Sequence, residues 1–177
     1  MFVVQQSITA EEEQEFVKNF EAMKARIGEE TRRMVSFPVD KSLIRILAIA
    51  NRWPESPDRL YWDEEYARKS RWGGIIAPPN FNPFAYHIDE DRMAGSARKM
   101  GDVGVGRGNR GMDAGAEAEY FAPIRPGDVI TAVSKIADVY RRDTAAMGPT
   151  FFVVTETTWT NQRGELVKIY RGGGIRY

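Results

Sequence analysis

The sequence contains no cysteine and only one histidine among its 177 residues. The lack of cysteine excludes disulfide bonds, thiolate metal sites and thiol nucleophiles. One histidine with scattered carboxylates also argues against a zinc site, because zinc in proteins is held by several nitrogen or sulfur ligands at close spacing. We therefore expect neither a metal ion nor a bound cofactor.

An excess of one charge and long hydrophobic runs are also missing. The 25 basic and 25 acidic residues cancel, so no strong electrostatic attraction to nucleic acid or to a membrane surface is expected. No apolar run approaches the ~18 residues that a membrane span needs. The first residues, MFVVQQ, have no basic segment before the apolar ones, which is unlike a secretory signal. These features predict a soluble cytoplasmic protein with neither nucleic acid nor membrane as a partner.

The chain has enough apolar sequence for one core. Its length suits a single domain, residues 1–177, and 42% of its residues are hydrophobic. Thr9 and Glu12 have the spacing of a capping box, and apolar residues at helical spacing follow. An N-terminal amphipathic helix is therefore predicted at about 9–26. Asp40 can cap a second helix.

Prolines divide the middle of the chain. Residues 52–62 contain two prolines and few helix formers, so they are predicted to form an overhanging loop. A short helix is predicted at 63–69. A central helix is predicted at about 79–91, because its leading proline needs no backbone hydrogen bond and has its φ already set. Phe81 and Phe84 give this helix an apolar stripe at helical spacing.

The residues from 112 to 175 have the pattern of successive strands. Alanines alternate with Asp113 and Glu117 over 112–122, which predicts a half-buried strand with the two carboxylates on one face. Arg125–Asp128 places proline and glycine as a type II turn requires. Strands rich in β-branched and aromatic residues are predicted at 129–141, at 150–160 and from Glu165 onward. Short turns imply an antiparallel sheet. The fold class is therefore α+β: a curved antiparallel sheet around one long central helix, with an extra N-terminal helix.

A glycine-rich basic segment covers residues 94–111. It contains the spacing GxGxxG from Gly106 to Gly111, which binds a dinucleotide only after a strand and before a helix. Here the residues that follow alternate like a strand, so the favoured interpretation is a mobile surface loop that lines a ligand site. A nucleotide-binding loop is the minor alternative.

Four segments stand out as motifs: Phe37–Asp40, Tyr61–Ala67, Gly74–Pro79 and Tyr120–Asp128. Together they resemble the MaoC-like dehydratases, and most closely their N-terminal, fatty-acid-synthase-like dehydratase half. The resemblance covers roughly residues 8–170. It implies a hot-dog fold, in which the predicted central helix is wrapped by the sheet. It also implies acyl-CoA or acyl-carrier thioesters as ligands, (R)-specific hydration of a 2-enoyl group or the reverse dehydration, and pairing of two hot-dog units.

The resemblance fails at the positions that carry the family's chemistry. Hydration needs a general acid and base on one water, and the family supplies an Asp and a His in a G-D-x-N-P-x-H loop. In this sequence the His position falls on Tyr61, the Asp position on Ser56 and the Asn position on Asp58. A backbone N–H that holds the thioester oxygen falls on Pro79, which has no N–H.

The favoured hypothesis is therefore a non-catalytic, acyl-binding subunit that pairs, as a heterodimer, with a catalytic MaoC-like partner. A homodimeric hot-dog protein, a hydratase with a replaced active site, an acyl-CoA thioesterase and an acyl-CoA-binding module are the alternatives. For the replaced site the candidate groups are Tyr61, Asp58, His87, Asp113 and Glu117, although a packing tyrosine, a core histidine and solvated strand carboxylates are the commoner situations. The implied substrate-binding positions are Tyr61, Pro79, Asn80, Phe81, Phe84 and Gly115.

Overall fold

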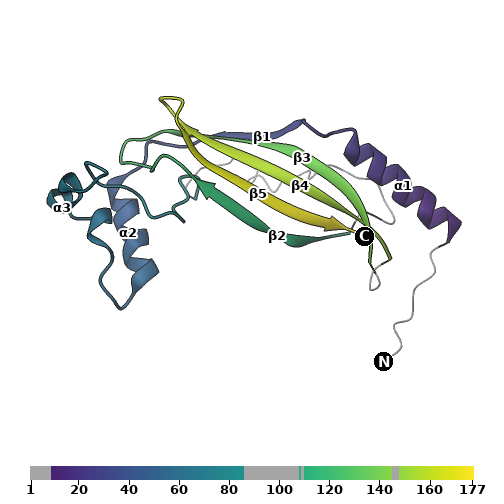
Figure 1. The fold of residues 1–177 in the computed structure, drawn as a ribbon, viewed down its shortest axis with the longest axis horizontal. Helices are drawn as coiled ribbons and strands as arrows, with labels where there is room; N and C mark the ends of the chain where they lie inside the picture. The colour runs from purple at the N-terminus through teal and green to yellow at the C-terminus, as the bar shows by residue number, and fades with distance from the viewer. Residues whose placement is uncertain (1–8, 86–107, 109, 145–147) are drawn as a thin grey trace, which may run out of the picture.

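The protein folds around a curved antiparallel sheet of five strands in the order β1-β3-β4-β5-β2 (Figure 1). The computed structural model describes residues 9–85, 108, 110–144 and 148–177. The sheet confirms the predicted antiparallel α+β architecture and each predicted C-terminal strand. The strands are β1 (Glu30–Val35), β2 (Gly111–Tyr120), β3 (Ile130–Thr144), β4 (Gly148–Asn161) and β5 (Leu166–Arg176).

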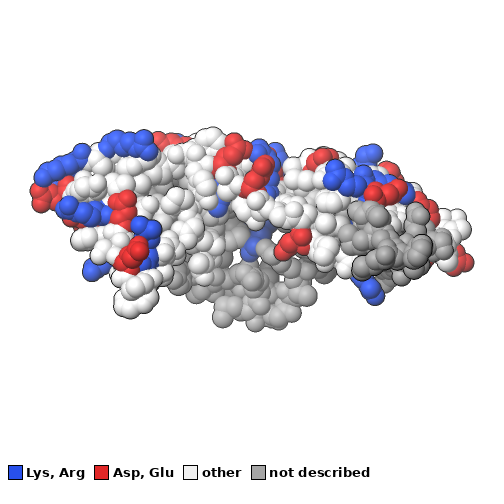
Figure 2. Space-filling view, turned by 60° about the horizontal axis from the view of Figure 1, so that its bottom comes forward, with Lys and Arg blue, Asp and Glu red and all other residues white. Residues whose placement is uncertain are grey.

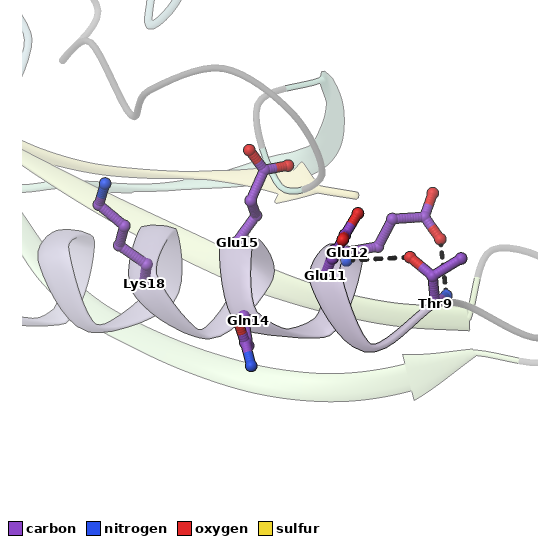
Figure 3. A pocket seen from close by; sticks show the side chains of 6 residues that line it. All are labelled: Thr9, Glu11, Glu12, Gln14, Glu15 and Lys18. Carbon is purple, nitrogen blue, oxygen red and sulfur yellow. Dashed lines mark hydrogen bonds between the residues drawn. The ribbon is translucent and has the colours of Figure 1, made fainter.

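Helix α1 (Ala10–Lys24) packs at one end of the sheet (Figure 1). Its capping box is present, as the sequence predicts. The Thr9 N–H donates to Glu12 Oε2 at 2.8 Å, and the Glu12 N–H donates to Thr9 Oγ1 at 3.2 Å (Figure 3). The buried Phe16 ring meets the Phe151 ring of β4 edge to face, with centroids 5.6 Å apart. This contact fixes α1 on the sheet.

The other end of the sheet carries α2 (Lys41–Arg52), the 3₁₀ turn η1 (Arg59–Tyr61) and α3 (Glu64–Lys69) (Figure 1). Asp40 caps α2 by accepting the Ser42 N–H at 2.6 Å, which confirms the predicted second helix. The short helix predicted at 63–69 is confirmed as α3. The predicted overhanging loop contains η1, which the sequence did not indicate.

Within the described residues, two hydrophobic clusters lie at the two ends of the long strands. The first lies at the end of the sheet that carries α2 and α3. Its buried members are Val39, Ile44, Ala67, Ile75, Ala77, Phe81, Ile124, Ile130, Ala132, Trp159 and Val167. The second fixes α1; its buried members are Phe16, Met23, Ile136, Val139 and Phe151. Both clusters use β3 and β4, so these two strands connect the ends of the molecule.

The predicted central helix does not begin at Pro79. Residues 79–85 form turns rather than a helix. The physical reason lies at Asn82, because the proline that follows it disfavours the helical conformation. The Asn82 side chain instead accepts the Phe84 N–H at 3.0 Å, as in an Asx turn. Residues 86–91 of the prediction lie outside the described residues.

The strand predicted as half-buried is an edge strand with both faces open. Nearly every residue of β2 is exposed, and only Ala118 is half-buried. A bulge between Asp113 and Gly115 shifts its register against β5, and Gly115 adopts a φ of +97°. Because a bulge inserts one residue, the alternation of faces is reversed across it. The sequence pattern shows alternation but does not show the inserted residue.

The glycine-rich segment reaches the described residues at Gly108. This glycine is buried, and a Cβ there would approach Phe151 Cε1 to 3.0 Å. Its φ of +86° is also one that side chains rarely adopt. Gly108 therefore serves close packing against aromatic rings and is not part of a surface loop. Residues 94–107 of the predicted loop lie outside the described residues.

Among the described helices, none is both long and apolar enough to cross a membrane. Acidic and basic side chains are interspersed on the face in Figure 2, in keeping with the balanced composition.

Candidate functional site

A cavity of about 270 Å³ lies between the C-terminal end of α2, the η1 turn and the segment around Pro79. It brings together four of the residues singled out from the sequence, which are Asp58, Tyr61, Pro79 and Asn80. Sequence reasoning missed the other half of the lining. The lining residues are Ala48, Asn51, Arg52, Asp58, Tyr61, Pro78, Pro79 and Asn80.

Asn51 and Asn80 join two walls of the cavity. The Asn51 Nδ2 group donates to Asn80 Oδ1 at 2.9 Å, and the Asn80 Nδ2 group donates back to Asn51 Oδ1 at 3.0 Å. The pair links the last turn of α2 to the turn that follows the two prolines. Only the spatial approach of segments 29 residues apart creates this pair, so no local sequence signal predicts it.

Tyr61 supplies the phenol of the cavity. Its ring is half-buried and packs against the first hydrophobic cluster. Burial raises the pKa of the Tyr61 hydroxyl above its ordinary value, the negative charge of Asp58 adds to this, and Arg52 opposes it. The hydroxyl is therefore a neutral donor at physiological pH and a poor base.

Asp58 is the N-terminal cap of η1. Its carboxylate accepts the Leu60 N–H at 2.9 Å, and this bond holds the turn that presents Tyr61. The carboxylate therefore has a structural partner within its own turn. Arg52 brings a positive charge to the same cavity.

The segment from Ile76 to Phe81, whose prolines line one wall of the cavity, offers few backbone donors. The Ala77 N–H donates to Ile124 O at 2.8 Å, and the Phe81 N–H donates to Pro78 O at 2.9 Å. Pro78 and Pro79 have no N–H to donate. A developing oxyanion at this wall therefore lacks the donor that a glycine would supply at position 79.

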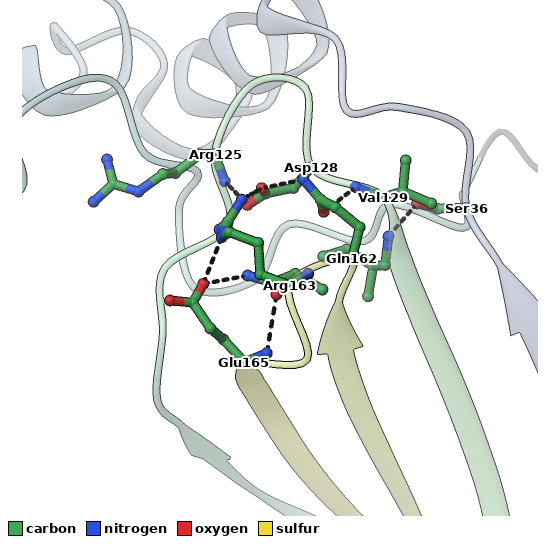
Figure 4. A network of polar contacts seen from close by, with 9 residues as sticks. Ser36, Arg125, Asp128, Val129, Gln162, Arg163 and Glu165 are labelled. Atoms are coloured by element: carbon green, nitrogen blue, oxygen red, sulfur yellow. Dashed lines mark hydrogen bonds and ion pairs between the residues drawn. The ribbon is translucent and has the colours of Figure 1, made fainter.

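The buried carboxylate of Asp128 holds the turn that supports this wall of the cavity. Asp128 is 2% exposed and accepts the Arg125 N–H at 2.8 Å and the Arg163 Nη1 group at 2.9 Å (Figure 4). Gly127 has a φ of +83°, and the Asp128 N–H donates to Arg125 O at 3.1 Å, which confirms the predicted type II turn. This turn directly follows Ile124, whose carbonyl holds Ala77 at the cavity wall.

Phe81 and Phe84 lie beside the cavity but not in its lining. Phe81 is buried in the first cluster, and Phe84 packs against it. The Phe84 ring meets the Trp159 ring edge to face, with centroids 5.2 Å apart. These two predicted positions are core residues that connect the segment after the cavity lining to the sheet.

The structure does not bring Asp113 and Glu117 together. Asp113 pairs with Gly174 and Glu117 with Arg171, and these two β5 positions point to opposite faces of the sheet. The prediction that the two carboxylates share a face is therefore wrong, and the bulge is the reason. Gly115 lies in this bulge, outside the cavity lining. The remaining candidate, His87, lies outside the described residues.

Glu117 belongs to a row of alternating charges on the outer face of the sheet. Arg171 Nη1 lies 3.5 Å from Glu117 Oε1, and its Nε lies 2.9 Å from Glu156 Oε2. Lys135 Nζ lies 2.9 Å from Glu156 Oε1. The hydrogen bonds from Lys135 and Arg171 lower the pKa of Glu156. This row explains Glu117 as a strand-pairing residue.

A larger hollow of about 450 Å³ is lined by side chains of α1 and its cap alone (Figure 3). A single helix surface provides no opposing wall, so this hollow is not a candidate site. Across the described part of the chain, no group of three or more His, Asp or Glu side chains could hold a metal ion.

A family model described as "FAS1-like, dehydratase domain region" matches residues 25–170, which is most of the chain. The chain belongs to this family. A curated relative of this chain is the "Probable enoyl-CoA hydratase alpha subunit" of Thermomonospora curvata, with 25% identity over 174 residues. The match covers 93% of this chain and 52% of the relative. The chain thus spans about half the length of that relative.

Solved structures confirm the hot-dog fold of this chain. The ChsH1-ChsH2 complex from Mycobacterium tuberculosis contains a chain with 18% identity and a TM-score of 0.62, covering 93% of this chain and 96% of that one. The MaoC-like dehydratase from Rhodospirillum rubrum has 22% identity and a TM-score of 0.51, covering 82% and 90%. The predicted resemblance to MaoC-like dehydratases is therefore confirmed.

The cavity contains two of the positions that the resemblance assigns to the family's acid–base loop. The motif positions assigned from the sequence end at Tyr61, and the structure places Tyr61 and Asp58 in the cavity lining. The lining holds one phenol, one guanidinium and one carboxylate with a backbone partner. Such a set can hold a polar group by hydrogen bonds.

Proposed function

We propose that this chain is the non-catalytic, acyl-binding half of a two-hot-dog hydratase or dehydratase that acts on acyl thioesters. The thioester, carried by CoA or an acyl carrier, is the substrate, and no cofactor takes part. The observation that carries the proposal is the composition of the cavity. Its lining holds Tyr61 and Asp58 where the family has a histidine and an asparagine.

The chemistry of hydration explains why this composition matters. A group that removes a proton from water near neutral pH must have a pKa close to that pH. The raised pKa of Tyr61 moves it away from this range. The Asp58 carboxylate is engaged by its own turn. The chain can therefore hold an acyl thioester, while a partner supplies the acid–base pair.

Three observations support a partner that is itself a hot-dog unit. The curated relative is named an alpha subunit, and this chain matches only 52% of its length. The solved structures that share the fold include the ChsH1-ChsH2 complex. Within the described residues, β2 pairs only with β5, so its other edge is available to a second sheet.

The test is hydration of crotonyl-CoA, followed by loss of the enoyl thioester absorbance. The purified chain would be assayed alone and after co-expression with a MaoC-like partner that retains the Asp–His loop. We expect activity only in the mixture. In the mixture, changing the partner's catalytic histidine should abolish turnover, whereas Tyr61→Phe in this chain should change mainly KM.

Activity of the chain alone, lost in Asp58→Asn, would instead establish a replaced active site. Release of free thiol from acyl-CoA would identify a thioesterase. Binding without turnover in every combination would identify an acyl-CoA-binding module. Each result contradicts the proposed subunit role.

A further inference from the structure

Lys168 lies on the inner face of β5 with its ammonium among three aromatic rings. Lys168 Nζ is 4.6 Å from the centroid of Trp159, 5.3 Å from that of Tyr120 and 5.4 Å from that of Tyr170. The strand register places Lys168 directly opposite Trp159 of β4 and Tyr120 of β2. Three strands therefore build this cage.

The ammonium has no carboxylate partner within the described residues. Lys135, on the outer face of the same sheet, pairs with Glu156 at 2.9 Å, but no such ion pair is found for Lys168. Burial lowers the pKa of Lys168. Aromatic faces attract a cation but leave its three N–H donors free for oxygen acceptors.

The cage adjoins the segment that follows the cavity lining. Trp159 forms one side of the cage and meets the Phe84 ring at 5.2 Å between centroids. Trp159 also belongs to the same buried cluster as Phe81. On the other side of the cage, Tyr120 and Tyr170 are exposed. Phe84 lies four residues after Asn80 of the cavity lining, so its contact with Trp159 places the Lys168 ammonium near the cavity.

We propose that Lys168 is a ligand-binding residue that pairs with a negatively charged oxygen group of the acyl thioester. The proposal rests on the function proposed above and specifies the ligand further. The negative oxygens belong either to a phosphate of CoA or to a carboxylate on the acyl chain. Both have the acceptors that a caged ammonium requires, and charge-assisted hydrogen bonds of this kind are the strong ones.

The test is calorimetric binding of CoA, octanoyl-CoA and adipoyl-CoA to the complex of this chain with its catalytic partner. Lys168→Met should weaken binding by at least ~10-fold, since hydrogen bonds to charged groups contribute about 1.5–3 kcal/mol. Lys168→Arg should retain binding within about threefold, because it keeps the charge and the donors. Lys135→Met is the matched control and should leave binding unchanged, because Lys135 lies on the outer face. Equal thermal unfolding of the variants would show that each is folded.

The three ligands distinguish a CoA phosphate from an acyl carboxylate as the group that pairs with Lys168. An equal loss for all three ligands assigns the pairing to a CoA phosphate, and a loss confined to adipoyl-CoA assigns it to the acyl carboxylate. Equal binding of all ligands by wild type and Lys168→Met overturns the role of Lys168 and leaves the proposed function standing. A wild-type complex that binds none of them overturns both proposals.

A second measurement compares the chemical accessibility of Lys168 with and without bound ligand. Acetic anhydride labelling, followed by mass spectrometry of the Lys168 peptide, should show slower acetylation when ligand is bound. Lys135 should label at the same rate with and without ligand. Unchanged labelling of Lys168 in a complex shown to hold ligand contradicts the proposal.

Discussion

Among single residues, Asp128 does most to hold the cavity wall in place. Its buried carboxylate connects the turn after Ile124 with the Arg163 side chain of the β4–β5 hairpin. Replacing it by alanine leaves the partly buried Arg125 N–H without its acceptor. The cost of such a loss is about 2–4 kcal/mol.

We therefore expect Asp128→Ala to lower the free energy of unfolding by that amount, measured as a shift of the urea midpoint at unchanged m-value. Asp143→Ala is the control, because the Asp143 side chain is 65% exposed and surface changes stay within about 0.5 kcal/mol. Equal midpoints for the two variants would show that the Asp128 network does not stabilise the fold.

The partial burial of Tyr61 leads us to expect that the folded state loses stability at alkaline pH. Because burial raises its pKa, the unfolded chain releases this proton near pH ~10 while the folded chain retains it. The unfolded state therefore binds fewer protons in this window, and wild type should lose stability as pH rises through it. Below the unfolded pKa the contribution is fully present.

The measurement is the difference in unfolding free energy between wild type and Tyr61→Phe from pH 8 to about pH 11. The difference should shift in favour of Tyr61→Phe above pH ~10. A difference that does not change with pH would mean that Tyr61 ionises equally in both states.

Among single residues, the sequence predicts those whose role depends on near neighbours in the chain or on the spacing of a motif. Thr9, Asp40 and Gly127 take the roles that capping and turn chemistry assign to them. Motif spacing also placed Tyr61 in the cavity. Lys168 escaped prediction, because its cage depends on the register of three strands.

Among the elements, α1 depends most on one side chain. Phe16 is fully buried and contacts Phe151 of β4. Removing a buried phenylalanine side chain costs about 3–5 kcal/mol. We expect Phe16→Ala to destabilise the protein by this amount in thermal or urea unfolding.

Val17 on the same helix provides the matched control, since it is 41% exposed. Val17→Ala should change stability by less than about 0.5 kcal/mol. If Phe16→Ala were as mild, α1 would not be fixed by its aromatic contact.

Elements that begin at a capping residue were predictable from the sequence. Elements that depend on contacts between distant segments were not. Helices α1, α2 and α3 begin at caps that the sequence displays. Strand β1 carries Arg32 and Arg33 and lacks the apolar pattern of a strand, so only its pairing with β3 defines it. The bulge of β2 is also invisible in the alternation of its residues.

For the whole molecule, the free edge of β2 gives the clearest prediction. If a second hot-dog sheet pairs with this edge, the backbone amides that point outward from residues 111–120 become hydrogen-bonded. Their hydrogen exchange should slow at least ~10-fold when the catalytic partner is added. The other edge strand, β1, should exchange at an unchanged rate and serves as the internal control. Unchanged exchange in β2 in a complex of proven composition would exclude sheet pairing at this edge.

The division of the core into two clusters has a consequence for how the protein unfolds. The clusters share β3 and β4 but lie at opposite ends of these strands. Regions that open separately usually coincide with such packed units. Within the described residues the α1 end has its own packed cluster, so we expect it to detach as one cooperative unit while the cavity end keeps its core. Mutations could accumulate at the α1 end without altering the shape of the cavity, so the two ends of one small domain can evolve at different rates.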